Sequence, residues 1–124
     1  MRASARLTDG TGVLLCDGRE VAALEILASR RARYRGLLGR DDLDGAVLLA
    51  KTNGVHTFGM RFPIDVAYLS RDLRVIAVAH MPRNRLGRNR LTARHTLEAA
   101  AGSLAAWSIA KGSRLAIGHA APPT

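Results

Sequence analysis

Two carboxylates stand inside stretches of sequence that are otherwise mostly apolar. Asp65 lies within residues 64–69 and Glu98 within residues 96–100, and both stretches have the composition of β-strands. A carboxylate in such surroundings needs hydrogen-bond partners, and two carboxylates that converge can serve as a general acid and a general base. The pattern therefore indicates a polar site on an apolar framework. A hydrolase-like enzyme with Asp65 and Glu98 as the acid/base pair is one hypothesis.

Each carboxylate also has a structural interpretation. Asp65 follows Pro63 closely and could hold an irregular turn by accepting hydrogen bonds from backbone N–H groups. Glu98 could pair with one of the many arginines, such as Arg61 or Arg94. A carboxylate in a structural ion pair is perturbed much as one in an active site is. The sequence leaves the catalytic and the structural interpretation open.

The segment before the first carboxylate adds three candidate ligand-binding side chains. His56 could act as a general base or a metal ligand, Thr57 carries a hydroxyl, and Met60 could line a pocket. His80 and His95 are further histidines, but no pair has the close spacing of a metal motif such as H-x-H or H-E-x-x-H. We therefore expect no metal site and no cofactor.

The chain is strongly basic, and arginine supplies nearly all of the positive charge. There are 19 Lys+Arg residues against 10 Asp+Glu, which gives a net charge of +9. Residues 82–91 are rich in arginine and asparagine, and guanidinium groups bind carboxylates and phosphates in a bidentate fashion. The candidate anion-binding residues are Arg61, Arg83, Arg85, Arg88, Arg90 and Arg94.

This arginine-rich loop has no aromatic side chains that could stack on single-stranded nucleic acid. The whole chain contains two tyrosines, two phenylalanines and one tryptophan, and it has no helix-turn-helix or zinc-finger pattern. We therefore expect an anionic small molecule or an acidic protein as partner, and we do not expect a dedicated nucleic-acid site. Weak polyanion binding through the loop is the alternative.

The elements that must position these groups are short apolar runs separated by glycine, asparagine and aspartate. Strands are expected at residues 13–16, 19–27, 46–50, 64–69, 74–80, 96–100 and 114–117. Asp17 and Gly18 tolerate positive φ and predict a tight hairpin turn. The pattern indicates a mostly β (α+β) fold, an antiparallel β-sandwich or a jelly-roll-like open barrel with two short helices.

The two helices are expected at residues 29–38 and 104–110. Ser29 and Ser103 are the predicted N-caps, because a serine side-chain oxygen can accept from a backbone N–H of the first turn. Gly39 and Gly112 are the predicted terminators, since glycine adopts the left-handed conformation that often ends a helix.

The length of 124 residues and the 48% hydrophobic content predict one globular domain over residues 10–120, with loose ends at 1–9 and 121–124. The single cysteine, Cys16, excludes an internal disulfide framework and is expected to be a buried small apolar residue. No apolar run approaches the roughly 20 residues of a membrane-spanning helix. The polar first ten residues lack a signal core, so we expect a cytoplasmic protein without a membrane span.

Four ordered blocks of the sequence resemble a known family, the domain of unknown function 192. They are residues 33–40 (RYRGLLGR), 56–66 (HTFGMRFPIDV), 97–102 (LEAAAG) and 109–113 (IAKGS). Three positions depart from the family pattern: Gly59 replaces a usual tryptophan, Ser113 replaces a usual aspartate, and Gly45 begins an atypical strand. The resemblance implies a compact β-sandwich fold and no established reaction.

The function is therefore open at this point, including whether the protein is an enzyme. The leading hypothesis is a small binding or accessory module. Its polar pocket would be formed by residues 56–65 and Glu98, and surrounding arginines would favour an anionic ligand or partner. The acid/base enzyme and the weak polyanion binder are the alternatives.

Overall fold

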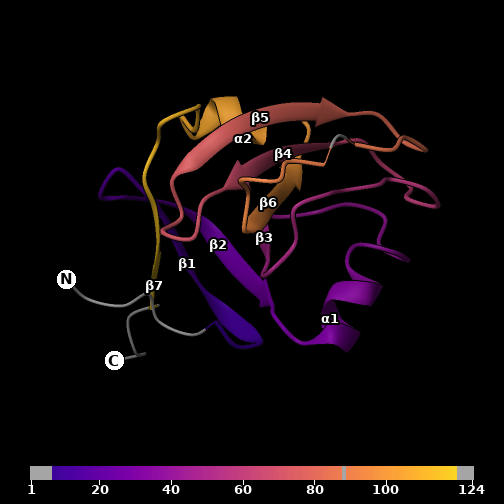
Figure 1. Cartoon of the computed structure of the whole chain (residues 1–124), viewed down its shortest axis with the longest axis horizontal. Helices are drawn as coiled ribbons and strands as arrows, with labels where there is room; N and C mark the ends of the chain where they lie inside the picture. Colours follow the sequence, from indigo (N-terminus) through magenta and orange to yellow (C-terminus); the bar gives the residue numbers. More distant parts are fainter. Residues whose placement is uncertain (1–6, 88, 120–124) are drawn as a thin grey trace.

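Seven strands form a single sheet in the part of the chain that the structure, a computed structural model, describes: residues 7–87 and 89–119. The strands are β1 (Gly10–Cys16), β2 (Arg19–Leu27), β3 (Ala46–Leu49), β4 (Ile64–Leu69), β5 (Val75–Met81), β6 (His95–Ala100) and β7 (Leu115–Gly118). Their order across the sheet is β5-β4-β6-β3-β2-β1-β7, and the sheet curls into a half-barrel (Figure 1).

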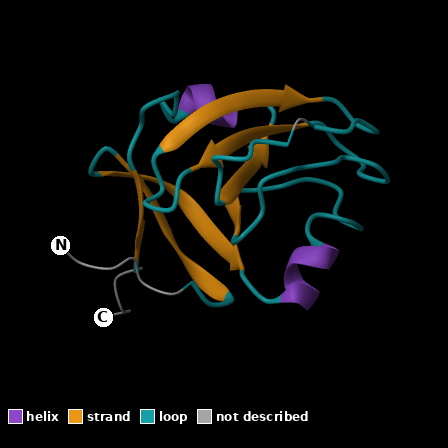
Figure 2. Cartoon of the chain, viewed as in Figure 1, coloured by secondary structure: helices purple, strands orange, loops and turns teal. Residues whose placement is uncertain are grey.

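The expected mostly β fold with two short helices is confirmed in its open-barrel form, because the strands share one curled sheet (Figure 2). One pair departs from the antiparallel expectation: β2 and β3 run parallel, with Leu24 opposite Ala46. Residues 28–45, which include the first helix, form the crossover that a parallel pair requires.

Two local features shape the sheet: a tight turn between β1 and β2, and a contact between its two edges. Asp17 and Gly18 have φ values of 49° and 84°, which confirms the tight hairpin between β1 and β2. At the far edges β5 approaches the residues before β7, where the Val75 N–H donates to the Ser113 carbonyl oxygen at 2.9 Å. The edges of the half-barrel therefore meet at one end.

Both helices are shorter than expected. Helix α1 (Arg30–Arg35) begins at the predicted cap, where Ser29 Oγ accepts from the Ala32 N–H at 3.1 Å, and it ends at Gly36. Helix α2 (Ser103–Ala106) is capped by Gly102 and not by a serine side chain, so that cap prediction was wrong. In the described residues no helix is long and apolar enough to cross a membrane.

Of the predicted loose ends, the structure describes residues 7–9 only. Residues 1–6 and 120–124 lie outside the described part of the chain. Asp9 is held to the fold, because its Oδ1 atom accepts from the N–H groups of Ala28 and Ser29 at 2.6 and 2.8 Å. This carboxylate therefore ties the start of β1 to the start of α1.

A hydrophobic core covers each face of the sheet. The first contains Leu14, Cys16, Leu48 and Leu97 and packs under α2. The second contains Leu37, Val47, Val66, Tyr68 and Met81, among others. Neighbouring residues of β3 belong to different cores because side chains alternate between the faces of a strand. The face on which a polar residue lies therefore decides which groups it can meet.

Candidate functional site

Glu98 lies near the centre of the sheet, between Val47 of β3 and Val66 of β4. The residue is 5% exposed, and its carboxyl group makes no hydrogen bond with any residue that the structure describes. Burial raises the pKa of Glu98 to about 7, and the Arg40 guanidinium acts in the opposite direction. Glu98 is therefore a buried acid that gains its charge only near neutral pH.

The cation beside Glu98 is fixed by a second glutamate. Arg40 donates to both carboxylate oxygens of Glu25, at 2.9 and 3.0 Å. Glu25 lies opposite Val47, which in turn lies opposite Glu98, so the two glutamates share one face of the sheet. Because Arg40 already has a bidentate partner, it leaves the Glu98 carboxyl with only long-range attraction.

Three more polar groups lie on the same face as Glu98. Thr96 is fully buried, stands opposite Tyr68, and its Oγ1 has no hydrogen-bond partner among the described residues. The Arg90 guanidinium lies over the Tyr68 ring, with Cζ 5.4 Å from the ring centroid. Arg90 Nε is likewise buried without a described partner, and burial raises the pKa of Tyr68. Glu98 therefore belongs to a polar cluster within the second core.

Asp65 has a structural role at the edge of the first core. Its Oδ2 accepts from the Gly102 N–H at 2.8 Å, and its Oδ1 lies 3.0 Å from Nδ1 of His80 on β5. The first contact holds the residue that caps α2. The second links β4 to its neighbour. Asp65 thus accepts a backbone hydrogen bond, as the structural interpretation expected, but the donor is at α2 and not in the turn near Pro63.

The structure does not bring Asp65 and Glu98 together. Asp65 is opposite Ala99, whereas Glu98 is opposite Val66, so the two carboxylates occupy successive positions of adjoining strands. Side chains at successive positions point to opposite faces of a sheet. A hydrolase-like activity stays an untested prediction, and on this geometry it would have to use Glu98 without Asp65.

Thr57 joins the other predicted residues to the arginine-rich loop. Its buried Oγ1 donates to the Pro82 carbonyl oxygen at 2.6 Å and accepts from the Arg85 N–H at 2.8 Å. The Thr57 N–H donates to the Arg85 carbonyl oxygen at 2.8 Å, and Met60 is buried in the second core. Thr57 and Met60 therefore fix this part of the chain and do not offer free ligand-binding groups.

The arginines that were predicted to bind anions together lie in different environments. Arg61 pairs with Asp41 at 2.6 Å, and Arg90 lies over Tyr68. Arg83, Arg85 and Arg94 are exposed, whereas Arg88 lies outside the described residues. Neither predicted ion-pair partner of Glu98 contacts it. The cation that affects its pKa is Arg40, which the sequence patterns did not single out.

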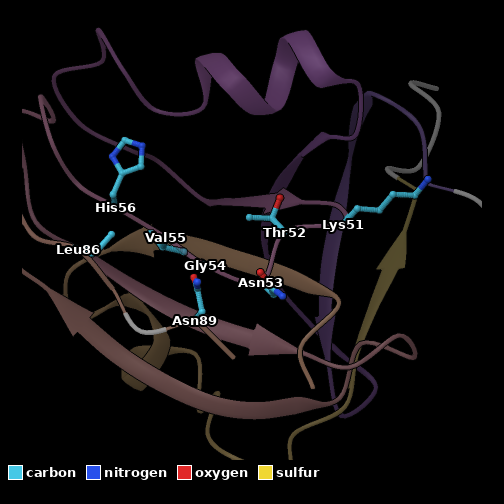
Figure 3. Close-up of a pocket in the computed structure, with 8 residues that line it drawn as sticks. All are labelled: Lys51, Thr52, Asn53, Gly54, Val55, His56, Leu86 and Asn89. Carbon is cyan, nitrogen blue, oxygen red and sulfur yellow. The ribbon is translucent and has the colours of Figure 1, made fainter. Parts of the chain in front are cut away.

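His56 is the predicted ligand-binding residue that borders a pocket. The pocket has a volume of about 380 Å³ and is lined by Lys51, Thr52, Asn53, Gly54, Val55, His56, Leu86 and Asn89 (Figure 3). None of these residues is acidic. Lys51 and Asn53, which stand a few residues before His56, were the signal that could have revealed the pocket.

Close packing between two distant segments builds this pocket. A Cβ atom at Gly54 would displace the Asn89 side chain, which reaches toward it from the arginine-rich loop (Figure 3). A Cβ at Gly87 would lie 2.7 Å from the Val55 carbonyl oxygen. The His56 ring, at one end of the pocket, stacks on Phe58 with the ring centroids 5.6 Å apart.

Cys16 and His95 both have structural roles. Burial raises the pKa of the Cys16 thiol, which disfavours the reactive thiolate. Burial also lowers the pKa of His95, and its Nδ1 accepts from the Lys51 N–H at 2.9 Å. This bond anchors the start of residues 51–57, which we call the pocket segment. Among residues 7–87 and 89–119, no three His, Cys, Asp or Glu side chains gather where they could hold a metal ion.

The chain is a small half-barrel domain built on one curled sheet, and its polar pocket is lined by Lys51 and His56 among others. Residues 13–117 match the sequence profile of DUF192, a family described as "Uncharacterized ACR", and the chain belongs to this family. No protein with a curated description matches the chain.

Two solved structures share the fold. A proposed transcription regulator from Sinorhizobium meliloti 1021 matches with a TM-score of 0.76 at 16% identity, covering 91% of this chain and 98% of that one. A protein of unknown function from Novosphingobium aromaticivorans DSM 12444 matches with a TM-score of 0.71 at 19% identity, covering 86% and 82% of the two chains. These likenesses show the half-barrel fold.

Proposed function

We propose that the protein is a small binding module whose pocket takes an anionic group of a small molecule or of an acidic protein. One observation carries the proposal: the pocket lining combines Lys51 and His56 with the side-chain amides of Asn53 and Asn89, and none of its eight residues is acidic. Ammonium, imidazole and amide groups all donate hydrogen bonds to carboxylate or phosphate oxygens.

A further cation supports the pocket from α1. The Arg33 guanidinium lies within 3.4 Å of the Ala50 carbonyl oxygen and 3.2 Å of the Lys51 carbonyl oxygen, so its charge is held at one end of the pocket segment. Thr52 is not counted among the donors, because its hydroxyl already donates to Ala50 at 3.0 Å. The net charge of +9 adds a long-range attraction for anions.

The test uses the isotope-labelled full chain and two simple anions, citrate and inorganic phosphate, at constant ionic strength. We expect saturable shifts of the backbone N–H signals of residues 52–56 and of the side-chain amide signals of Asn53 and Asn89. The same titration is repeated at about 0.15 M salt, where exposed charges farther apart than roughly 8 Å are largely screened.

Two results would overturn the proposal. The first is the absence of saturable shifts with either anion. The second is a set of shifts confined to exposed arginines such as Arg83 and Arg85 that disappears with salt, which would support weak polyanion binding. The proposal includes a cytoplasmic location and no dedicated nucleic-acid partner, and fractionation of cells that express the tagged chain tests the location.

A further inference from the structure

The pocket segment is bonded along one edge only. The Asn53 and Val55 carbonyl oxygens accept from the N–H groups of Arg90 and Gly87, at 2.9 and 2.7 Å. The Thr57 N–H completes the series by donating to the loop. Asn53, Val55 and Thr57 therefore use their backbone groups to hold the arginine-rich loop, as one strand holds another.

The even-numbered residues present the opposite edge. The backbone N–H and C=O groups of Thr52, Gly54 and His56 make no hydrogen bond with any described residue. In an extended segment, alternate residues direct these groups to opposite edges. We call Thr52, Gly54 and His56 the open edge. An open strand edge is a ready template for pairing with another extended chain.

The side chains and exposure of the open edge suit such a chain. Thr52 and Gly54 are partly exposed, His56 is exposed, and Val55 directs its side chain into the core. Leu86, at 76% exposed, and Phe58, at 51%, give the His56 end an apolar surface. Strand addition combines main-chain hydrogen bonds with such contacts for alternate side chains.

Charge selects the kind of chain that fits. Lys51 and the Arg33 guanidinium lie at one end of the segment, His56 lies at the other, and no lining residue is acidic. We propose that the open edge accepts an extended, acidic peptide segment of a partner protein as an added strand. Its carboxylates would lie near the cations and an apolar side chain near the stacked rings of His56 and Phe58. This inference rests on the proposed function and names the partner of the same pocket.

The test measures binding of one probe peptide, acetyl-Glu-Thr-Glu-Val-Glu-Thr-amide, to the full chain. Two variants carry N-methyl groups on alternate residues, one on the odd and one on the even positions. Methylation removes N–H donors and retains the charge. A strand pairs through alternate residues, so we expect one variant to lose at least about tenfold in affinity and the other to lose less than about threefold. Amide exchange at Gly54 and His56 should slow in the complex.

The outcomes separate this inference from the proposed function. Equal affinities of the two methylated peptides, or unchanged exchange at Gly54 and His56, would overturn strand addition. If citrate still shifts the pocket amides in that case, the proposed anion site stands. If neither citrate nor the peptide binds, both proposals fail. Binding of a glutamine-substituted peptide as tight as that of the probe would overturn the acidic specificity.

Discussion

Replacing Glu98 with glutamine should change how the stability of the protein depends on pH. Glutamine resembles the neutral carboxylic acid in size and shape, and it cannot ionise. Glu98 is 5% exposed and has no described hydrogen-bond partner to stabilise its charge. Ionisation must therefore occur in a buried setting, and Arg40, the cation that lowers the pKa of Glu98, is already paired with Glu25.

The sign and size of the effect follow from the shifted pKa. The pKa of Glu98 rises from 4.5 to about 7, so the folded state holds the proton more tightly than the unfolded state. The stability that the tightly held Glu98 proton contributes is fully present below pH 4.5 and is lost progressively as the pH rises through 7. At about 1.4 kcal/mol for each pKa unit, the loss is roughly 3 kcal/mol.

Urea unfolding at pH 5 and pH 8 measures the effect. At pH 8, Glu98→Gln should be about 3 kcal/mol more stable than the parent, and at pH 5 the difference should fall to about 1 kcal/mol. The exposed Glu20 on β2 supplies the control, since Glu20→Gln should follow the parent at both pH values. Protonation of His95 contributes equally to all three proteins and cancels. A difference between Glu98→Gln and the parent that is the same at both pH values would refute the reasoning.

Substitutions at four positions test other contacts of the fold and of the pocket. Thr57→Val should lower the free energy of unfolding by about 2 kcal/mol, because it leaves two partly buried backbone groups unpaired, and Thr57→Ser should restore most of it in a urea titration. Asp65→Ala should cost about 1 kcal/mol through loss of the Gly102 contact and leave citrate affinity unchanged; a large affinity loss would contradict this separation. Gly87→Ala should destabilise by more than about 1 kcal/mol, because the new Cβ meets backbone, whereas Gly54→Ala should mainly displace the Asn89 side chain and weaken citrate binding; equal Tm shifts would be the contrary result.

The strands were readable from the sequence because each carries a short apolar run between turn residues. Asp17 and Gly18 also adopt the positive φ values that their residue types favour. The face occupied by Asp65 relative to Glu98 was not readable. Alternation defines the two faces within each strand, but the pairing register between β4 and β6 decides which faces coincide. A shift of one residue would have placed both carboxylates together.

The pocket escaped prediction for a related reason. Its walls come from residues 51–56 and from Leu86 and Asn89, which meet through irregular pairing across about thirty residues of chain. Local patterns indicate a turn and a basic loop, and they carry no information on their contact. Arg40 was missed likewise, because its proximity to Glu98 depends on the β2–β3 crossover.

The ratio of citrate dissociation constants for Lys51→Gln and Lys111→Gln tests the binding claim most directly. These are the two lysines of the chain, and they are both exposed, but only Lys51 lines the pocket. The substitutions change the net charge equally, so any long-range effect cancels. An exposed charge contact is worth up to about 1 kcal/mol, which predicts that Lys51→Gln binds citrate about fivefold more weakly than Lys111→Gln. Equal dissociation constants would contradict an anion site at this pocket.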